Sequence, residues 1–185
     1  MDLCYFCDIA SGKERRVHIA FEDDLAIAVL ATEPINPGQL SVFPRAHLDA
    51  LEALGEASVA RFFDIARRLV RAIRAAGLRC EGTELHLSEG PTSGLPHATL
   101  QLLPRFEGDW LWREARLSWN RSHGRGPRPP LWWEELPARL LREPWLPKRE
   151  VSDEELSDLA SKIRQAYWSQ WSNDPAAALQ PTLKS

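Results

Sequence analysis

Two cysteines near the start of the chain have a spacing that is typical of metal sites. Cys4 and Cys7 are separated by two residues, so both thiolates can bind one ion. A single pair of this kind is weak evidence, because two reduced thiols at the edge of a core also fit it. The chain has 3 cysteines, and we expect no secretory signal, which favours thiols or a metal site over disulfides.

Residues 97–105 predict a strand with polar side chains on one face. Side chains alternate along a strand, so the polar and apolar residues of this segment separate onto opposite faces. The polar face consists of His97, Thr99 and Gln101. The wet side of a half-covered sheet has the same pattern, so the segment alone does not indicate a site.

Three stretches, residues 4–7, 37–47 and 97–105, together resemble the histidine triad (HIT) superfamily of nucleotide hydrolases and transferases. The family signature alternates three histidines with apolar residues and then runs into Pro-Arg. Here His97 is the first histidine, Thr99 takes the second position and Gln101 the third. The resemblance implies an α+β fold with an antiparallel sheet of about five strands, and a homodimer. Hairpins and one long helix without repeating β-α-β units favour the same architecture.

The resemblance also implies a structural zinc site. A subset of the family binds zinc through an N-terminal CxxC pair, a histidine after the Pro-Gly strand and the first histidine of the triad. The matching residues are Cys4, Cys7, His47 and His97. Two thiolates and two imidazoles make a closed tetrahedral site, which suits Zn²⁺ and leaves no open position for catalysis. We expect no ligand role for Cys80, His86 or His18, and His18 has no evident partner.

The position that carries the family's chemistry is altered. The resemblance implies that the middle histidine attacks the α-phosphate and forms a nucleotidyl-histidine intermediate. Imidazole suits this task because its unperturbed pKa is about 6.5, whereas the hydroxyl of Thr99 is a poor nucleophile without a base. Gln101 is less unusual, because branches that include galactose-1-phosphate uridylyltransferase carry glutamine there. We therefore assign no catalytic residue among the three triad positions.

The residues that hold a nucleotide in the family are also changed. An aspartate that grips the ribose is replaced by Ala31, and an asparagine before the phosphate loop by Ser88. The loop of residues 90–97 is shorter than usual, although its backbone amides remain available to a phosphate. The candidate ligand-binding residues are Ser88, Ser93, Gly94, Thr99 and Gln101.

Three functions remain open. The first is a catalytically degenerate HIT protein that binds at most weakly a nucleotide or another phosphorylated ligand. The second is an active nucleotide hydrolase or nucleotidyltransferase with a relocated nucleophile, for which His123 in a basic, Gly- and Pro-rich loop is the candidate. The third is single-stranded nucleic-acid binding through the Trp- and Arg-rich residues 105–150, although we expect these tryptophans to pack against the domain or a second subunit.

The spacing of apolar residues and the helix-capping residues predict the strands and helices of the chain. Strands are predicted over residues 17–21, 25–30, 40–43 and 83–88, in addition to the segment that begins at His97. Apolar residues at helical spacing predict a long helix over residues 59–73, with Ser58 as N-cap and Gly77 as the stop. Ser152 and Glu155 form a predicted capping box before a C-terminal amphipathic helix.

Composition bounds the organisation of the chain. Its 185 residues suit a single domain over residues 1–171, with residues 105–150 as an extension within it and residues 172–185 as a flexible tail. The net charge of −3 gives no overall attraction to nucleic acid. No apolar run is long enough to span a membrane, so we expect a cytoplasmic protein.

Overall fold

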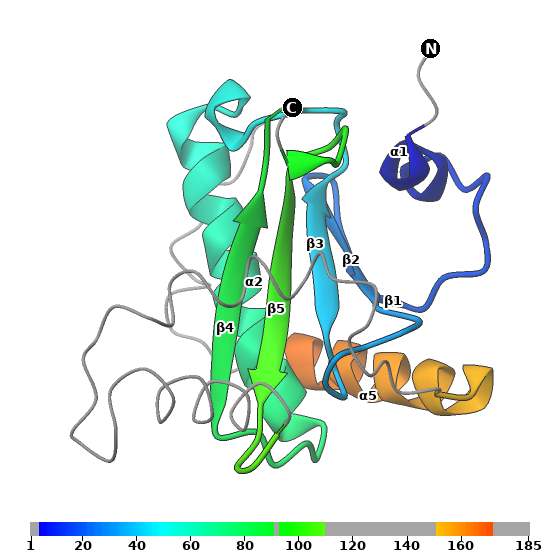
Figure 1. The fold of residues 1–185 in the computed structure, drawn as a ribbon. Helices are drawn as coiled ribbons and strands as arrows, with labels where there is room; N and C mark the ends of the chain where they lie inside the picture. The colour runs from blue at the N-terminus through cyan, green and yellow to red at the C-terminus, as the bar shows by residue number, and fades with distance from the viewer. Residues whose placement is uncertain (1–3, 91–92, 110–150, 172–185) are drawn as a thin grey trace, which may run out of the picture.

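The computed structural model describes residues 4–90, 93–109 and 151–171, and its centre is a five-stranded sheet (Figure 1). The strands are β1 (Ile19–Glu22), β2 (Ala26–Leu30), β3 (Leu40–Pro44), β4 (Gly82–Ser88) and β5 (Thr99–Arg105). They lie in the order β1-β2-β3-β5-β4, and all neighbours are antiparallel. The α+β fold with an antiparallel sheet, one long helix and a C-terminal helix is confirmed. Two strands begin two residues later than predicted, since β1 starts at Ile19 and β5 at Thr99, so that His97 precedes β5.

The helices of the described chain are α1 (Tyr5–Ala10), α2 (Glu56–Ala75) and α5 (Asp153–Trp171), with a 3-10 turn, η1, at Leu51–Ala53. The predicted N-cap of the long helix was wrong: Gly55 is the N-cap, and Ser58 already lies in the first turn, where its amide donates to the Gly55 carbonyl. The predicted stop is confirmed, since Gly77 follows the helix with a φ of 92°. That left-handed conformation is one that glycine adopts without strain.

One face of the sheet is covered by α2 and α5, with α2 running behind the strands in Figure 1. Leu100 and Leu102 point from β5 into this core, where they meet Phe62 and Leu69 of α2. Apolar residues of α2 recur every three or four positions, so they form one stripe toward the sheet. Tyr167 of α5 completes the core and is fully buried.

The opposite face carries a second, smaller core under α1. Phe6 and Ile9 lie three residues apart, so they share one side of this short helix. They pack on Ile27 and Val29 of β2 and on Phe43 of β3. The residues of β2 are therefore buried on both sides, which explains why its sequence reads as a continuous apolar run rather than an alternating one.

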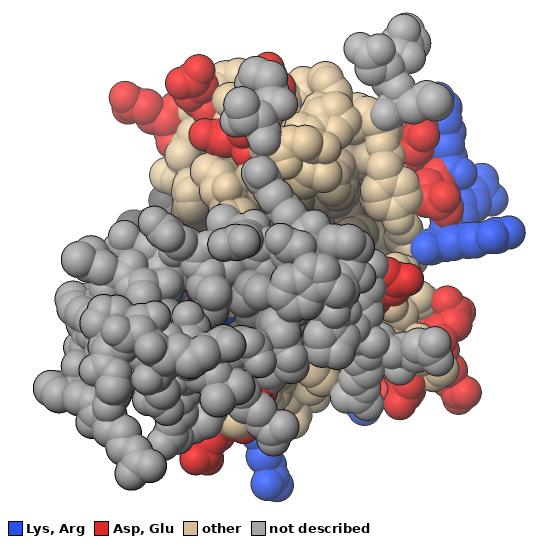
Figure 2. All heavy atoms as spheres, viewed as in Figure 1, with Lys and Arg blue, Asp and Glu red and all other residues tan. Residues whose placement is uncertain are grey.

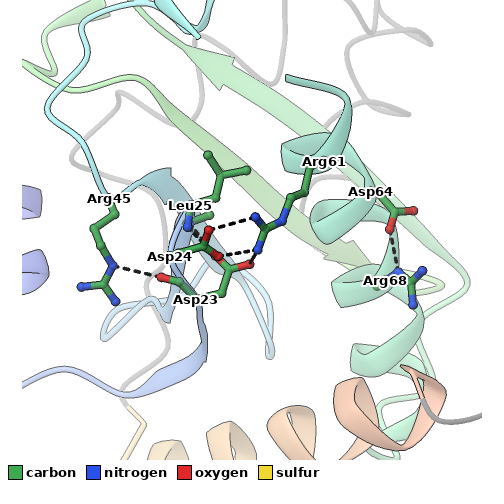
Figure 3. A network of polar contacts seen from close by, with 8 residues as sticks. Asp23, Asp24, Leu25, Arg45, Arg61, Asp64 and Arg68 are labelled. Carbon is green, nitrogen blue, oxygen red and sulfur yellow. Dashed lines mark hydrogen bonds and ion pairs between the residues drawn. The ribbon is translucent and has the colours of Figure 1, made fainter. Parts of the chain in front are cut away.

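The acidic turn between β1 and β2 is tied to α2 and to the end of β3 (Figure 3). An Asp23 carboxylate oxygen accepts hydrogen bonds from the amides of Leu25 and Ala26, which closes the turn. Arg61 of α2 bonds to the carboxylates of Asp23 and Asp24, and Arg45 donates to the Asp23 carbonyl. These bonds hold the turn of the β1-β2 hairpin against α2.

The C-terminal helix begins as predicted. The Ser152 hydroxyl accepts from the Glu155 amide at 3.2 Å, and the Glu155 carboxylate accepts from the Ser152 amide at 3.0 Å. The expectation that His18 lacks a partner was wrong. Its ring contacts Ser157 at 3.2 Å and Asp153 at 3.0 Å. It therefore anchors the start of α5 beside β1.

A buried polar cluster closes the sheet at the end where β5 stops. The Asn36 side chain donates to the Pro104 carbonyl at 2.8 Å and to the Asp109 carboxylate at 2.9 Å. Arg105 bonds to both carboxylate oxygens of Asp109 and forms an ion pair with Glu84.

Within the described residues, no helix is long and apolar enough to cross a bilayer.

Candidate metal centre

The topology brings three separate segments to one end of the sheet. Because β3 and β5 are antiparallel neighbours, the residues after β3 and those before β5 lie at the same end. His47 follows β3, His97 precedes β5, and α1 lies over this end (Figure 1). The Cys4 residue is the N-cap of α1 and Cys7 lies in its first turn, so both thiols are presented there.

Four potential metal ligands meet at this point. One ligand atom from each of Cys4, Cys7, His47 and His97 lies within 4.8 Å of all the others. The Cys7 sulfur is 3.1 Å from His47 Nδ1, and the Cys4 sulfur is 3.5 Å from His97 Nδ1. The Cys7 sulfur is also 3.8 Å from His97 Nδ1. The four side chains could therefore hold one ion.

The spacing fits a tetrahedral ion. With bonds of about 2.3 Å to sulfur and about 2.0 Å to nitrogen, ligand atoms at tetrahedral corners stand roughly 3.3 to 3.8 Å apart. The measured contacts of 3.1, 3.5 and 3.8 Å lie in or near that interval. The donor set of two sulfurs and two imidazoles is one that zinc favours in closed, structural sites.

His97 is held in the tautomer that a metal requires. Its ring lies between Phe6 and Phe43, with centroid distances of 5.6 Å to each, and the residue is fully buried. Its Nε2 lies 2.9 Å from the Pro44 carbonyl, which can only accept, so Nε2 carries the proton and Nδ1 offers a lone pair. Burial lowers the pKa of the His97 imidazole, which keeps it neutral near pH 7.

Without a metal ion, the pKa of Cys7 shifts in the direction that disfavours metal binding. Burial, the contact with Cys4 and the nearby Asp8 carboxylate raise the pKa of the Cys7 thiol to about 11. The thiol therefore stays protonated near neutral pH in the metal-free protein. A bound cation would supply the positive charge that a thiolate needs at this position.

Arg45 holds α1 in place beside the cluster. It lies two residues before His47, and its guanidinium donates to the Ala10 carbonyl at the end of α1, at 3.2 Å. The same group forms an ion pair with Glu22 at 3.0 Å. One side chain thus links the helix that carries the cysteines to β1 and to the loop that carries His47.

The triad positions on β5 have different surroundings. Thr99 is fully buried, and its hydroxyl donates to the His97 carbonyl at 3.0 Å. The side-chain amide of Gln101 pairs with the Ser41 hydroxyl on β3, at 2.9 and 3.1 Å. His86 is paired with Gln101 across β4 and β5, a proximity that sequence spacing could not reveal because it depends on the register of two strands.

The other candidate ligand-binding residues lie at or near the loop before β5. Ser88 is the cross-strand partner of Thr99. The Ser93 hydroxyl donates to the Gly90 carbonyl at 2.8 Å and accepts from the Leu95 amide at 3.1 Å, so it braces the loop. Gly94 has a φ of 74° and open space around its Cα.

Ala31, which takes the place of the family's ribose-binding aspartate, has mainly apolar surroundings. Ala31 lines a small cavity of about 180 Å³ together with Pro34, Leu78 and Leu159. Among the described residues that line it, Glu155 is the one acidic side chain, and it belongs to the α5 capping box. The candidate nucleophile His123 and the tryptophans between residues 110 and 150 lie outside the described residues.

Sequence comparison identifies relatives of this chain. A family model described as the HIT domain matches residues 13–95. An uncharacterized HIT-like protein of Methanocaldococcus jannaschii is 26% identical over 109 residues, which are 58% of this chain and 82% of that protein. Adenylylsulfatase HINT3 of Arabidopsis thaliana is 28% identical over 117 residues, 62% of this chain and 58% of that protein.

Solved structures share the fold. A zinc-bound histidine triad family protein from Mycobacterium smegmatis has a TM-score of 0.61 at 22% identity, covering 92% of this chain and 97% of that one. A hypothetical histidine triad nucleotide-binding protein from Sulfolobus tokodaii has a TM-score of 0.62 at 19% identity, covering 90% and 93%. At these identities the likeness establishes the fold alone.

Proposed function

We propose that this chain is a catalytically degenerate HIT protein with a structural zinc site, and the match of the HIT domain model to residues 13–95 supports the family assignment. The zinc is held by Cys4, Cys7, His47 and His97. The observation that carries this part is the convergence of their four ligand atoms within 4.8 Å. Zinc would fasten α1 to the ends of β3 and β5, and its four protein ligands leave no position for a substrate.

The degenerate reading rests on Thr99. A nucleophile must be accessible to the phosphorus atom and be activated by a base. The Thr99 hydroxyl is buried and donates to a backbone carbonyl, and the adjacent imidazole of His97 faces the cysteines. Any remaining ligand is a nucleotide or another phosphorylated small molecule, bound weakly near Ser88, Ser93, Gly94, Thr99 and Gln101.

Two measurements on the same sample test this proposal. Elemental analysis of protein purified without chelators should give one zinc per chain, and a calorimetric screen should give weak binding or none for nucleotides. A sample without zinc, in which the four side chains are intact, would overturn the metal assignment. Tight binding of a nucleotide would contradict the proposal that this chain binds nucleotides at most weakly.

The apparent affinity for zinc should rise with pH. Zinc binds the Cys7 thiolate, and the pKa of about 11 means that this group must release a proton at any pH below that value. His97 is already neutral near pH 7, so it contributes no further proton there. From Cys7 alone, we expect about a tenfold gain in affinity per pH unit between pH 6 and 8. Chelator competition across that range measures it, and an affinity independent of pH would contradict the thiolate ligand.

The family resemblance also leads us to propose a homodimer, with β4 at its interface. Within the described residues β4 pairs with β5 alone, so its outer edge is open. Leu85 and Leu87 on this strand are 51% and 38% exposed, and Phe63 of α2 is 42% exposed. An open edge beside apolar side chains is a surface that proteins usually cover, and a second copy could do so symmetrically.

Replacing Leu85 and Leu87 together with aspartate should convert the dimer to a monomer. Like charges would face each other across a symmetric strand pair, which is destabilising. Light scattering with size-exclusion chromatography gives the mass of each variant. Tyr5→Ser is a suitable control, because Tyr5 is equally exposed, at 52%, but lies on α1. A dimer that persists in the double variant would rule out β4 as the interface.

Two other functions have less support. A relocated nucleophile would depend on His123, whose surroundings lie outside the described residues. Nucleic-acid binding would favour a continuous basic surface. On the face in Figure 2, the described Lys and Arg side chains gather mainly near α1, and Asp and Glu side chains lie beside them.

A further inference from the structure

The two cysteines of the metal centre are also placed to react with each other. All three cysteines of the chain are free, and the ligand atoms of Cys4 and Cys7 lie within 4.8 Å of one another. A disulfide requires the sulfurs to approach to about 2.05 Å. Cys4 precedes α1 with an extended backbone, φ −108° and ψ 109°, so helical geometry does not fix its side chain. Rotation about the side-chain bonds can therefore bring the sulfurs together.

The two sulfurs differ in their access to solvent. Cys4 is 4% exposed, whereas Cys7 is partly exposed. A small oxidant therefore reaches Cys7 first, and Cys4 lies behind it. This is the arrangement of an attacked thiol next to a resolving thiol, in which a sulfenic acid is converted to a disulfide before further oxidation.

We propose that Cys4 and Cys7 form a redox-reactive pair, and that their oxidation to a disulfide expels the zinc. The inference rests on the proposed zinc site. A peroxide is the oxidant: one hydrogen peroxide and two protons react with the zinc-bound dithiolate to give one disulfide, one Zn²⁺ and two waters. The two sulfurs lose two electrons in total, and the peroxide oxygen–oxygen bond is cleaved. The bonds broken in the protein are the two zinc–sulfur bonds.

Loss of both sulfur ligands leaves too few donors to retain the ion. His47 and His97 remain, and they come from different segments of the chain. Structural zinc sites have four ligands, so two imidazoles do not hold the ion tightly. The helix α1 would then keep the apolar packing of Phe6 and Ile9 and the hydrogen bond from Arg45, but would lose its link through the ion to the ends of β3 and β5. The sheet and the core under α2 keep their contacts.

Treatment of the zinc-loaded full chain with hydrogen peroxide tests the proposal. A chromogenic chelator should report release approaching one zinc per chain, and the intact mass should fall by about 2 Da, as expected for one disulfide. Dithiothreitol followed by zinc should restore both. Amide exchange should become faster in residues 4–10 and stay unchanged in α2.

Two variants make the result specific. Cys80→Ala removes the remaining thiol and should leave zinc release and the mass change intact, whereas Cys7→Ser should not form the disulfide. The proposal is overturned if zinc stays bound, if the mass only increases by oxygen additions, or if the disulfide includes Cys80. If the purified protein holds no zinc, the proposed metal site fails, but the mass change in metal-free protein still decides whether the pair reacts.

Discussion

Replacing Cys7 with serine should abolish zinc binding and lower the free energy of unfolding by about 3 kcal/mol or more. Single substitutions usually cost roughly 0.5–3 kcal/mol, and loss of a metal is one of the few mechanisms that exceed this range. The loss should be smaller than the roughly 10–16 kcal/mol of isolated zinc-finger peptides, because this domain has two apolar cores of its own. Urea unfolding with metal analysis of each sample measures both effects.

Cys80→Ala is the matched control for this experiment. Cys80 is also buried, but it belongs to the core under α2 and not to the metal centre. Its replacement should leave one zinc per chain. A strong chelator should destabilise the wild type to the level of Cys7→Ser and leave that variant unaffected. If Cys7→Ser retains zinc, or if the chelator destabilises both proteins equally, the ion does not depend on this sulfur.

The four proposed metal ligands could be predicted from the sequence because their types and order match a pattern. The spacing of Cys4 and Cys7 suggested that they share an ion, and the resemblance supplied His47 and His97. The structure adds what a pattern cannot contain. The hydrogen bond from His97 to the Pro44 carbonyl, at 2.9 Å, joins residues that are 53 positions apart.

The errors of the sequence analysis have two causes: some local signals were weak, and some contacts join residues that are far apart in the sequence. The sequence predicted no helix over α1, because its six residues are too few for an apolar period to be seen. Ser58 is a better N-cap than Gly55 by type, but the extended backbone at Gly55 starts the helix three residues earlier. His18 contacts Ser157 across 139 positions, so no local pattern could have assigned it a partner.

Wild-type protein should give no turnover of nucleoside phosphoramidates, dinucleoside polyphosphates or nucleotidyl-sugars by a covalent route. That route needs an imidazole in line with the α-phosphate, and Thr99 presents a buried hydroxyl bonded to a carbonyl. Removal of a nucleophile leaves only what positioning and charge stabilisation supply. Positioning and charge stabilisation are also reduced. Ala31 has no group that can bind a ribose, and the Ser93 hydroxyl is hydrogen-bonded within its own loop. A threonine phosphoester would also be a poor intermediate, because an alkoxide leaves less readily than imidazole.

It follows that Thr99→His alone should restore little activity. Thr99 has 0% of its surface exposed, so a larger imidazole would have to displace its neighbours, at a typical cost of about 1–3 kcal/mol for overpacking. Trapping with a radiolabelled nucleotide, run alongside steady-state turnover, measures both the intermediate and the rate. Thr99→Val keeps the shape of the side chain without its hydroxyl and should behave like the wild type. Robust wild-type turnover that disappears in Thr99→Val or in His123→Ala would identify the nucleophile and replace the degenerate assignment with that of an enzyme.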